Sequence, residues 1–231
     1  MSRRSDKAEP EQIALPLGSA SASDPARIVV GDANKTVIDA LGSPHDWPFR
    51  TAVLTGPPRS GKSLLGRWFG LSHPAASVID DAQERSDTDL FHAWNRAQQA
   101  GAPLLLIASP EAPAPDHGTA AGDLFGGSGG WTIALPDLRS RLGAALHLEI
   151  SQPDEEMIAA LIESHAARRG LALPNGALTY LLPRIERSHA AAEEVVAEID
   201  RLSLERKAPP TLSIWRAALE AVQGPEQGEL L

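Results

Sequence analysis

Short apolar runs recur between residues 27 and 150, and stretches with a helical pattern separate several of them. The helix-like stretches include 63–69 and 88–100, and the apolar runs have the length of short buried strands. Strands and helices that alternate in this way are typical of a mostly parallel sheet with helices on both faces. We therefore expect an α/β core, with strands at 28–30, 52–54, 77–79, 104–107 and 146–150.

From residue 151 onward, the apolar positions follow a helical period instead. The spacing predicts a small all-helical domain, whose first helix has an apolar face formed by Met157, Ile158, Leu161 and Ile162. The segment carries more acidic than basic residues, so we do not expect it to bind DNA. The expected helix caps and stops are, in chain order, Ser151 with Asp154, then Gly170, Asn175, Pro183, Ser188, and Thr211 or Ser213.

Residues 1–25 are rich in Ser, Ala, Pro and acidic residues, a composition typical of disordered tails. An apolar hexapeptide, QIALPL at 12–17, interrupts this tail, and Pro16 disfavours a helix there. On its own, the hexapeptide is either a docking peptide or an accidental apolar segment. The predicted organisation is a tail at 1–25, a core at 26–152, a helical domain at 153–222 and a short tail at 223–231.

Composition narrows the function classes. The 231 residues carry a net charge of −9, which makes direct sequence-specific DNA binding a poor expectation because affinity for the phosphate backbone comes from clustered cations. The chain has no Cys, which excludes disulfides and thiolate chemistry and fits a reducing compartment. It has neither an apolar run long enough to span a membrane nor an apolar leader, so we expect a cytoplasmic protein without membrane contact.

The strongest chemical signal is the segment GPPRSGKS at 56–63, which matches G-x-x-x-x-G-K-[ST] in full. A strand-like run precedes it and a helix-like run follows, and in this setting backbone N–H groups and a helix N-terminus bind phosphate. Lys62 would reach the β- and γ-phosphates, and the Ser63 hydroxyl would bind Mg²⁺. The residues expected to bind nucleotide here are Gly56, Pro57, Pro58, Arg59, Ser60, Gly61, Lys62, Ser63 and Leu64.

An acidic pair, Asp80 and Asp81, directly follows the expected strand at 77–79. At the end of such a strand, Asp80 would lie beside the Mg²⁺ site and Asp81 would face the attacking water as a catalytic group. Few residues separate Ser63 from Asp80, which leaves little room for a further strand and helix. The sequence therefore predicts a trimmed core.

These motifs, in this order, resemble the AAA+ replication-initiator family around DnaA, and within it the short regulatory relatives of the Hda family. RIVVGDAN at 27–34 resembles the family's entry to the adenine pocket, and LPDLRSRLG at 135–143 resembles the box that holds its arginine finger. The resemblance implies an AAA+ P-loop NTPase core, a parallel sheet with flanking helices, followed by a helical lid. The residues that it assigns are Val30, Gly31 and Asn34 to the nucleotide pocket, and Arg141 to the finger.

The resemblance also implies a function, the negative regulation of chromosomal replication initiation. Such a protein holds ADP or ATP with Mg²⁺, docks on the DNA-loaded sliding clamp and promotes ATP hydrolysis by DnaA. Arg141 would act in trans on the nucleotide held by DnaA, and homo-oligomers are left open. The hexapeptide would bind the clamp through Gln12, Ile13, Leu15, Pro16 and Leu17.

Two positions depart from the family pattern. Ser109, which we still expect to line the nucleotide site, ends a strand where many relatives carry an Asp or Asn that senses the γ-phosphate. Ala190 stands where relatives carry the lid Arg. Arg187 lies one turn earlier and is the expected substitute in the nucleotide site. We therefore expect weak or no autonomous ATPase activity. Two alternatives stay open: a self-contained AAA+ ATPase or helicase-loader-like protein, and a non-hydrolysing adaptor stabilised by nucleotide.

Overall fold

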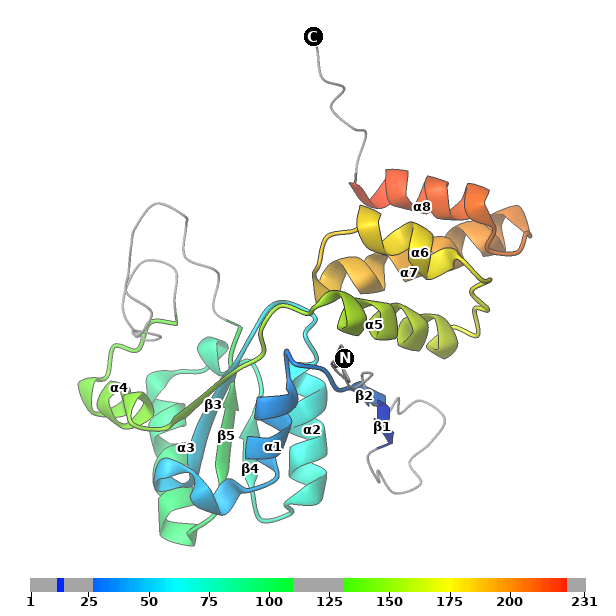
Figure 1. Cartoon of the computed structure of the whole chain (residues 1–231). Helices are drawn as coiled ribbons and strands as arrows, with labels where there is room; N and C mark the ends of the chain where they lie inside the picture. The colour runs from blue at the N-terminus through cyan, green and yellow to red at the C-terminus, as the bar shows by residue number, and fades with distance from the viewer. Residues whose placement is uncertain (1–11, 15–26, 110–130, 224–231) are drawn as a thin grey trace, which may run out of the picture. The chain divides into compact units, whose positions relative to one another are not determined.

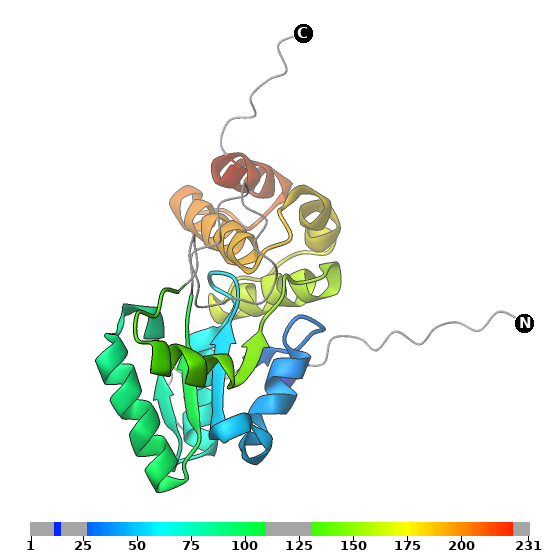
Figure 2. The same ribbon diagram turned by 90° about the vertical axis from the view of Figure 1, so that its left-hand side faces the viewer.

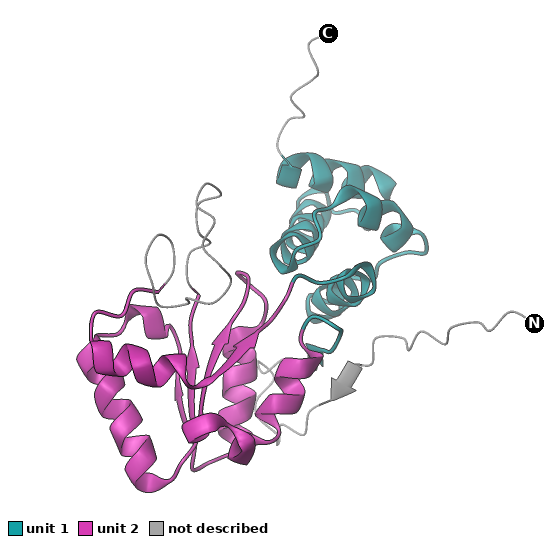
Figure 3. Cartoon of the chain, turned by 60° about the vertical axis from the view of Figure 1, so that its left-hand side comes forward, with its two compact units in different colours: residues 1–33, 152–231 teal, residues 34–151 magenta. Residues whose placement is uncertain are grey.

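The computed structural model describes residues 12–14, 27–109 and 131–223 (Figure 1). The chain forms two compact units (Figure 3). The core unit comprises residues 34–151, and the helical unit comprises residues 152–231 together with 1–33. Each unit has its own buried apolar cluster.

The core unit alternates strands and helices, as the apolar pattern predicts (Figures 1 and 2). No strand lies between α2 and β4, which agrees with the short spacing between Ser63 and Asp80. In chain order the elements are α1 (Lys35–Leu41), β3 (Thr51–Thr55), α2 (Lys62–Ser72), β4 (Ser77–Ile79), α3 (Asp87–Ala100), β5 (Leu104–Ile107), α4 (Pro136–Gly143) and β6 (Leu146–Glu149), with 3-10 turns at Pro44–Asp46, Pro48–Arg50 and Ala82–Glu84.

The sheet of the core unit has four parallel strands in the order β4-β5-β3-β6. Val53 of β3 pairs with Leu106 of β5 on one side and with His147 of β6 on the other. Every residue of the two central strands is buried, as expected for strands covered on both faces. Because all the strands run the same way, the segments that follow β3, β4 and β5 emerge at one edge, where ligands bind in open α/β sheets.

Helices cover both faces of this sheet, with α3 on one side and α2 on the other (Figures 1 and 2). Leu106 and Val53 belong to a cluster that includes Leu90 of α3 and Leu138 of α4. Ile107 points to the opposite face, where its Cδ1 atom lies so near to Gly66 of α2 that a Cβ atom on Gly66 would clash with it. Gly66 thus allows α2 to approach the sheet closely.

The apolar run at 28–30 is not part of the parallel sheet, so this part of the prediction is wrong. Instead, β2 (Arg27–Val29) pairs antiparallel with β1 (Gln12–Ala14) in a separate two-stranded sheet. Val29 and Ala33 pack against Met157 of the helical unit. This packing explains why the core unit starts at residue 34 and not at the expected residue 26.

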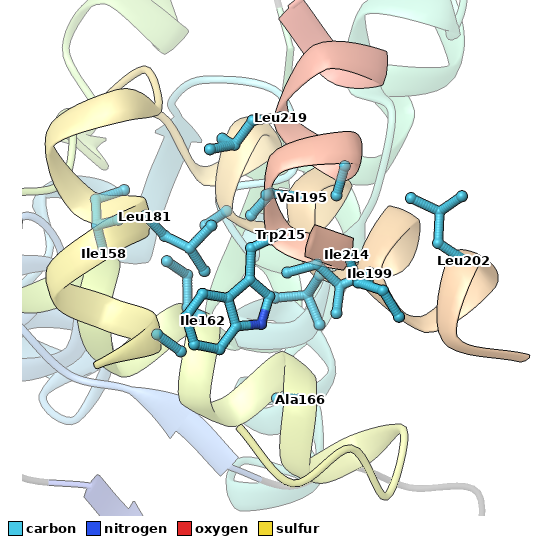
Figure 4. Packing of buried hydrophobic residues seen from close by; sticks show 14 residues of the cluster. Ile158, Ile162, Ala166, Leu181, Val195, Ile199, Leu202, Ile214, Trp215 and Leu219 are labelled. Carbon is cyan, nitrogen blue, oxygen red and sulfur yellow. The ribbon is translucent and has the colours of Figure 1, made fainter. Parts of the chain in front are cut away.

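The helical unit is built from α5 (Glu155–Arg168), α6 (Ala177–Leu181), α7 (His189–Arg206) and α8 (Leu212–Gln223), with a 3-10 turn at Leu182–Arg184. Trp215 of α8 lies among aliphatic side chains of the other helices, such as Ile162 and Ile199 (Figure 4). The expected apolar face of the first helix is confirmed, since Met157, Ile158 and Ile162 are buried and Leu161 is partly buried against the cluster of this unit. Within the described ranges, no helix has the length and apolar character needed to cross a membrane.

The expected caps are partly confirmed. The Ser188 Oγ atom accepts a hydrogen bond from the Ala191 N–H at 3.1 Å, and Gly170 follows α5 with a φ of +65°. The first helix begins later than expected, because Asp154, not Ser151, is its N-cap and accepts from the Met157 N–H at 2.8 Å. Gly176, in a left-handed conformation, replaces Asn175 as the cap of α6.

Candidate nucleotide-binding site

The loop 56–63 connects buried strand β3 to helix α2, as the motif predicts. Gly61 is the N-cap of α2 and has a φ of +87°, a conformation that favours glycine. Gly56 has a φ of +152°, and a Cβ atom there would lie 2.9 Å from both the Cβ and the carbonyl oxygen of Ile150. The two glycines therefore let the chain turn tightly between the sheet edge and the helix.

Lys62 is the first residue of α2, and its side chain is buried in the loop. Its Nζ atom donates hydrogen bonds to the carbonyl oxygens of Gly56 and Pro57, both at 2.8 Å. Burial lowers the pKa of the Lys62 ammonium, while the charges of Asp80 and Asp81 act in the opposite direction. A buried ammonium at a helix N-terminus is a setting in which a bound anion offsets the cost of desolvation.

The other side chains of the loop differ in exposure. The Ser60 Oγ atom is buried and makes no hydrogen bond to any described residue. A polar ligand in the loop would supply the missing hydrogen-bond partner. Ser63 is exposed at the start of α2, so its hydroxyl is accessible to a metal ion. Pro58 and Arg59 are exposed, and Arg59 has a φ of +60°. Leu64 is half-buried.

Asp80 and Asp81 follow β4, at the edge of the sheet that also carries the loop. Both carboxylates are close enough to Lys62 to affect its pKa. Asp80 is half-buried, and its Oδ1 atom accepts from the Asp81 N–H at 3.1 Å. Asp81 is exposed and has a φ of +51°, an unfavourable backbone conformation for an Asp that is often found at functional sites. The structure thus brings the acidic pair and the loop lysine together.

Ser109 follows β5, the strand between β3 and β4. Its backbone N–H donates to the Gln83 Oε1 atom at 3.1 Å, so the turn after the acidic pair is tied to the end of β5. Gln83 is not among the residues expected from the sequence. The only sequence signal for it is its position two residues after Asp81, within the 3-10 turn Ala82–Glu84.

The remaining residues expected at the nucleotide are divided between the two units. Asn34 is buried at the N-terminus of α1 in the core unit. Gly31 belongs to the helical unit, where a Cβ atom would lie 3.0 Å from the Met157 Sδ atom, and Val30 precedes it. Arg187 of the helical unit is exposed, and its Nη2 atom lies 2.9 Å from the Glu155 Oε2 atom. Their role at the nucleotide stays a prediction.

Arg141 lies near the end of α4, and its guanidinium is held within the core unit. Nε and Nη2 contact the two carboxylate oxygens of Asp137, at 3.1 and 2.8 Å. Nη1 donates to the Asn95 Oδ1 atom at 3.0 Å. The guanidinium carbon also lies 4.2 Å from the ring centroid of Trp94 and 4.9 Å from that of Phe91. The Arg141 side chain nevertheless remains 28% exposed, so it is accessible from outside.

The hexapeptide at 12–17 is only partly described. The backbone of Gln12 and Ile13 belongs to β1 and pairs with Val29 and Ile28 of β2. Leu15, Pro16 and Leu17 lie outside the described residues. Clamp binding by this peptide stays a prediction.

The oxygen atoms of Ser63 and Asp80 are of the type that Mg²⁺ prefers. Clusters of three or more His, Cys, Asp or Glu side chains that could hold a metal ion do not occur in the part of the chain that the structure describes. A magnesium ion at the loop would therefore depend on a few protein oxygens together with phosphate and water, which is its usual coordination in nucleotide sites.

Known proteins resemble the chain in both units. Residues 154–214 match the family model for the lid domain of Hda. Domain III of the replication initiation protein DnaA from Thermotoga maritima is similar over 86% of this chain and 95% of its own length, with 15% identity and a TM-score of 0.65.

Two further solved structures share the fold. The Thermotoga maritima RuvB Holliday junction branch migration motor is 14% identical, with a TM-score of 0.53 over 83% of this chain and 70% of its own. The replication initiator DnaA bound to AMPPCP and single-stranded DNA is 15% identical, with a TM-score of 0.53 over 78% of this chain and 66% of its own. The expected fold, a parallel sheet with flanking helices followed by a helical lid, is confirmed.

Proposed function

We propose that the chain is a DnaA-related AAA+ protein with an Hda-type lid, and that it is a negative regulator of replication initiation that promotes ATP hydrolysis by DnaA. The observation that carries the proposal is the loop 56–63 in its strand–helix setting, with the ammonium of Lys62 buried against two loop carbonyls. The loop alone supports nucleotide binding. The match of residues 154–214 to the Hda lid model supports the regulation of DnaA as the function that nucleotide binding serves.

In this proposal the loop holds the phosphates of ADP or ATP. The buried ammonium of Lys62 would pair with phosphate charge, and the Ser60 hydroxyl, which has no partner among the described residues, would donate a hydrogen bond to a phosphate oxygen. Ser63 and Asp80 would hold Mg²⁺, which neutralises phosphate charge when it is bound. Ser109 offers only a hydroxyl at the end of β5, so we expect the isolated protein to hydrolyse ATP weakly or not at all. Nucleotide then serves mainly to stabilise the folded protein by mass action.

Arg141 is the residue that we propose to act on DnaA. A guanidinium forms paired hydrogen bonds with phosphate oxygens and stabilises the negative charge of the transition state when a neighbouring subunit supplies it. The exposed fraction of Arg141 and its place on a surface helix support this role. Among the described residues, the contacts of the Arg141 guanidinium lie on α3 and α4, not on the loop 56–63.

Recruitment by the sliding clamp is the second part of the proposal. The peptide at 12–17 would bind a clamp pocket with modest affinity, because a segment of six residues buries only a small interface. Attachment to a clamp on DNA raises the local concentration of the regulator near DnaA, so a weak contact between the two proteins is sufficient. The acidic charge of the chain fits this arrangement, since the clamp provides the contact with DNA.

The test is hydrolysis of ATP bound to purified DnaA, measured with this protein, the clamp and DNA. The full chain should accelerate hydrolysis when the clamp is loaded on DNA and much less when the clamp is left out. The double substitution Gln12→Ala with Leu15→Ala should remove the clamp dependence and the retention of the protein on immobilised clamp. Equal acceleration with and without the clamp would contradict recruitment, and no acceleration in any mixture would contradict the proposed function.

A second candidate function is a nucleotide-stabilised adaptor that does not promote hydrolysis. The internal contacts of Arg141 with Asp137, Asn95 and Trp94 favour it, because they engage the guanidinium within its own chain. In that case ADP should raise the melting temperature of the protein, whereas Arg141→Ala should leave its biological effect unchanged. Loss of accelerated hydrolysis in Arg141→Ala would exclude the adaptor.

A further inference from the structure

Three side chains of helix α3 contact the guanidinium of Arg141. Trp94 and Asn95 lie three and four residues after Phe91, so each is a neighbour of Phe91 on the helix surface. Two of them place aromatic rings 4.9 and 4.2 Å from the guanidinium carbon, and Asn95 accepts a hydrogen bond from Nη1. We call these three residues the α3 seat.

Helix α3 also fixes the start of the helix that carries Arg141. The Asp87 Oδ2 atom, one turn before Phe91, accepts from the backbone N–H groups of Ala134 and Leu135, at 2.7 and 2.8 Å. Leu135 is the N-cap residue of α4. Both the origin of α4 and the tip of Arg141 are therefore positioned by α3.

Trp94 contacts Arg141 through the face of its ring and not through its indole N–H. The indole N–H is buried and has no hydrogen-bond partner among the described residues. Such a group is costly to bury, so a buried Trp usually satisfies it. Here the side chain instead presents its ring face to a cation, an interaction worth most when the ion is partly desolvated.

The contacts of Arg141 use different edges of the guanidinium. Asn95 binds Nη1, whereas the Nε–Nη2 edge lies on the Asp137 carboxylate. The Nε–Nη2 edge forms paired hydrogen bonds with planar anions and phosphates alike. A phosphate that replaced Asp137 would leave the rings and the Asn95 amide in contact with Arg141.

We propose that Trp94 and Asn95 are positioning residues, which hold the guanidinium of Arg141 so that its Nε–Nη2 edge is presented to the phosphate of a partner. This inference rests on the proposed function. It assigns to α3 a role in the reaction on DnaA that the motif at 135–143 does not contain. Asp137 occupies the presented edge until a triphosphate displaces it.

The kinetic test compares Trp94→Leu, Trp94→Phe and Asn95→Ala in the hydrolysis of DnaA-bound ATP, over a range of regulator concentrations. Trp94→Leu should lower the maximal rate by about 2- to 30-fold, the range of cation–π contacts, with little change in the half-saturating concentration. Trp94→Phe keeps an aromatic face and should recover most of the rate. An unchanged maximal rate in Trp94→Leu and Asn95→Ala would overturn the proposal, as would a loss that Phe does not recover.

A second measurement does not depend on DnaA. In NMR spectra of the full chain, the side-chain resonances of Arg141 should carry a ring-current shift from Trp94, assigned by their loss in Arg141→Lys. Trp94→Leu should abolish this shift, and an unchanged shift would overturn the proposal. If the shift behaves as expected but the wild-type protein does not stimulate DnaA, the proposed function is wrong, whereas the placement of Arg141 against the α3 seat is supported. Asn95→Ala, which creates only a small cavity, keeps the test valid if Trp94→Leu unfolds.

Discussion

The carboxylate of Asp137 occupies one edge of the Arg141 guanidinium, with oxygen atoms 3.1 Å from Nε and 2.8 Å from Nη2. The two residues are one helical turn apart on α4, and the Asp137 side chain is 55% exposed. Exposed pairs of this kind contribute little to stability, so the interaction is easily exchanged. In the proposed mechanism, Asp137 would therefore be a weak internal competitor for the phosphate that Arg141 contacts.

The first prediction concerns this competition. Asp137→Asn keeps the shape of the side chain and removes its charge, so Arg141 should become more available. The half-saturating concentration for stimulation of DnaA should fall by up to about five-fold, because an exposed pair is worth at most about 1 kcal/mol. Asp39→Asn, at an exposed position of α1, is the control for the loss of one charge and should have no effect. A higher half-saturating concentration in Asp137→Asn would contradict this interpretation of the pair.

The second prediction concerns nucleotide affinity. Lys62→Ala should raise the Kd for ADP and ATP by about 10- to 100-fold, since hydrogen bonds to charged groups contribute about 1.5–3 kcal/mol. Isothermal titration calorimetry with the wild-type and variant chains measures this change. Lys35→Ala, at the exposed first residue of α1, is the matched control and should bind nucleotide normally. Equal affinities for wild type and Lys62→Ala would show that the loop is not the phosphate site.

The third prediction concerns pH. Because burial lowers the pKa of Lys62 below its ordinary value of 10.5, the unfolded chain holds this proton more tightly than the folded chain. Without nucleotide, the Lys62 contribution to the free energy of unfolding should therefore rise with pH between the lowered pKa and 10.5. Urea unfolding of wild type and Lys62→Met is measured from pH 7 to 10. The Lys62 contribution is the difference between the two proteins in the slope of the free energy of unfolding against pH. Saturating ADP should reduce the difference in slope between the two proteins. A difference of the opposite sign would contradict the lowering of the Lys62 pKa by burial.

The fourth prediction compares the two loop glycines. Gly61→Ala meets no atom within 4 Å and should cost only the backbone strain of a positive φ, about 1–2 kcal/mol. Gly56→Ala combines that strain with contacts of 2.9 Å to Ile150, so it should lower the free energy of unfolding by a further 1–3 kcal/mol, roughly. Chemical denaturation measures both variants. If Gly61→Ala were the more destabilising change, the close approach of Gly56 to Ile150 would be wrong.

The conformation of the loop 56–63 could be predicted from the sequence because its residues are contiguous and its backbone conformation depends on neighbouring residues. Gly56, Gly61 and Lys62 have the expected setting between β3 and α2. The acidic pair could be placed beside it because parallel strands end at one edge of a sheet. Ser188 was predictable as a cap for a similar reason, since its hydrogen bond spans only three residues.

Other features depend on contacts between distant residues and could not be predicted. The apolar run at 28–30 has the pattern of a core strand, yet the packing of Val29 against Met157 places it in the helical unit. The α3 seat joins Arg141 to Asn95, which is 46 residues away in the chain. Trp94 is only partly a core residue, because its ring also faces Arg141, and no local pattern distinguishes these roles.

The most direct measurement compares Arg141→Ala with Arg139→Ala in the hydrolysis of DnaA-bound ATP on clamp-loaded DNA. Both arginines lie on α4, and Arg139 is exposed, so the second variant controls for the loss of a surface cation on the same helix. If Arg141 acts on the triphosphate of DnaA, Arg141→Ala should abolish the stimulation while Arg139→Ala retains it, with clamp binding and ADP affinity unchanged in both. Full stimulation by Arg141→Ala would contradict the proposed mechanism.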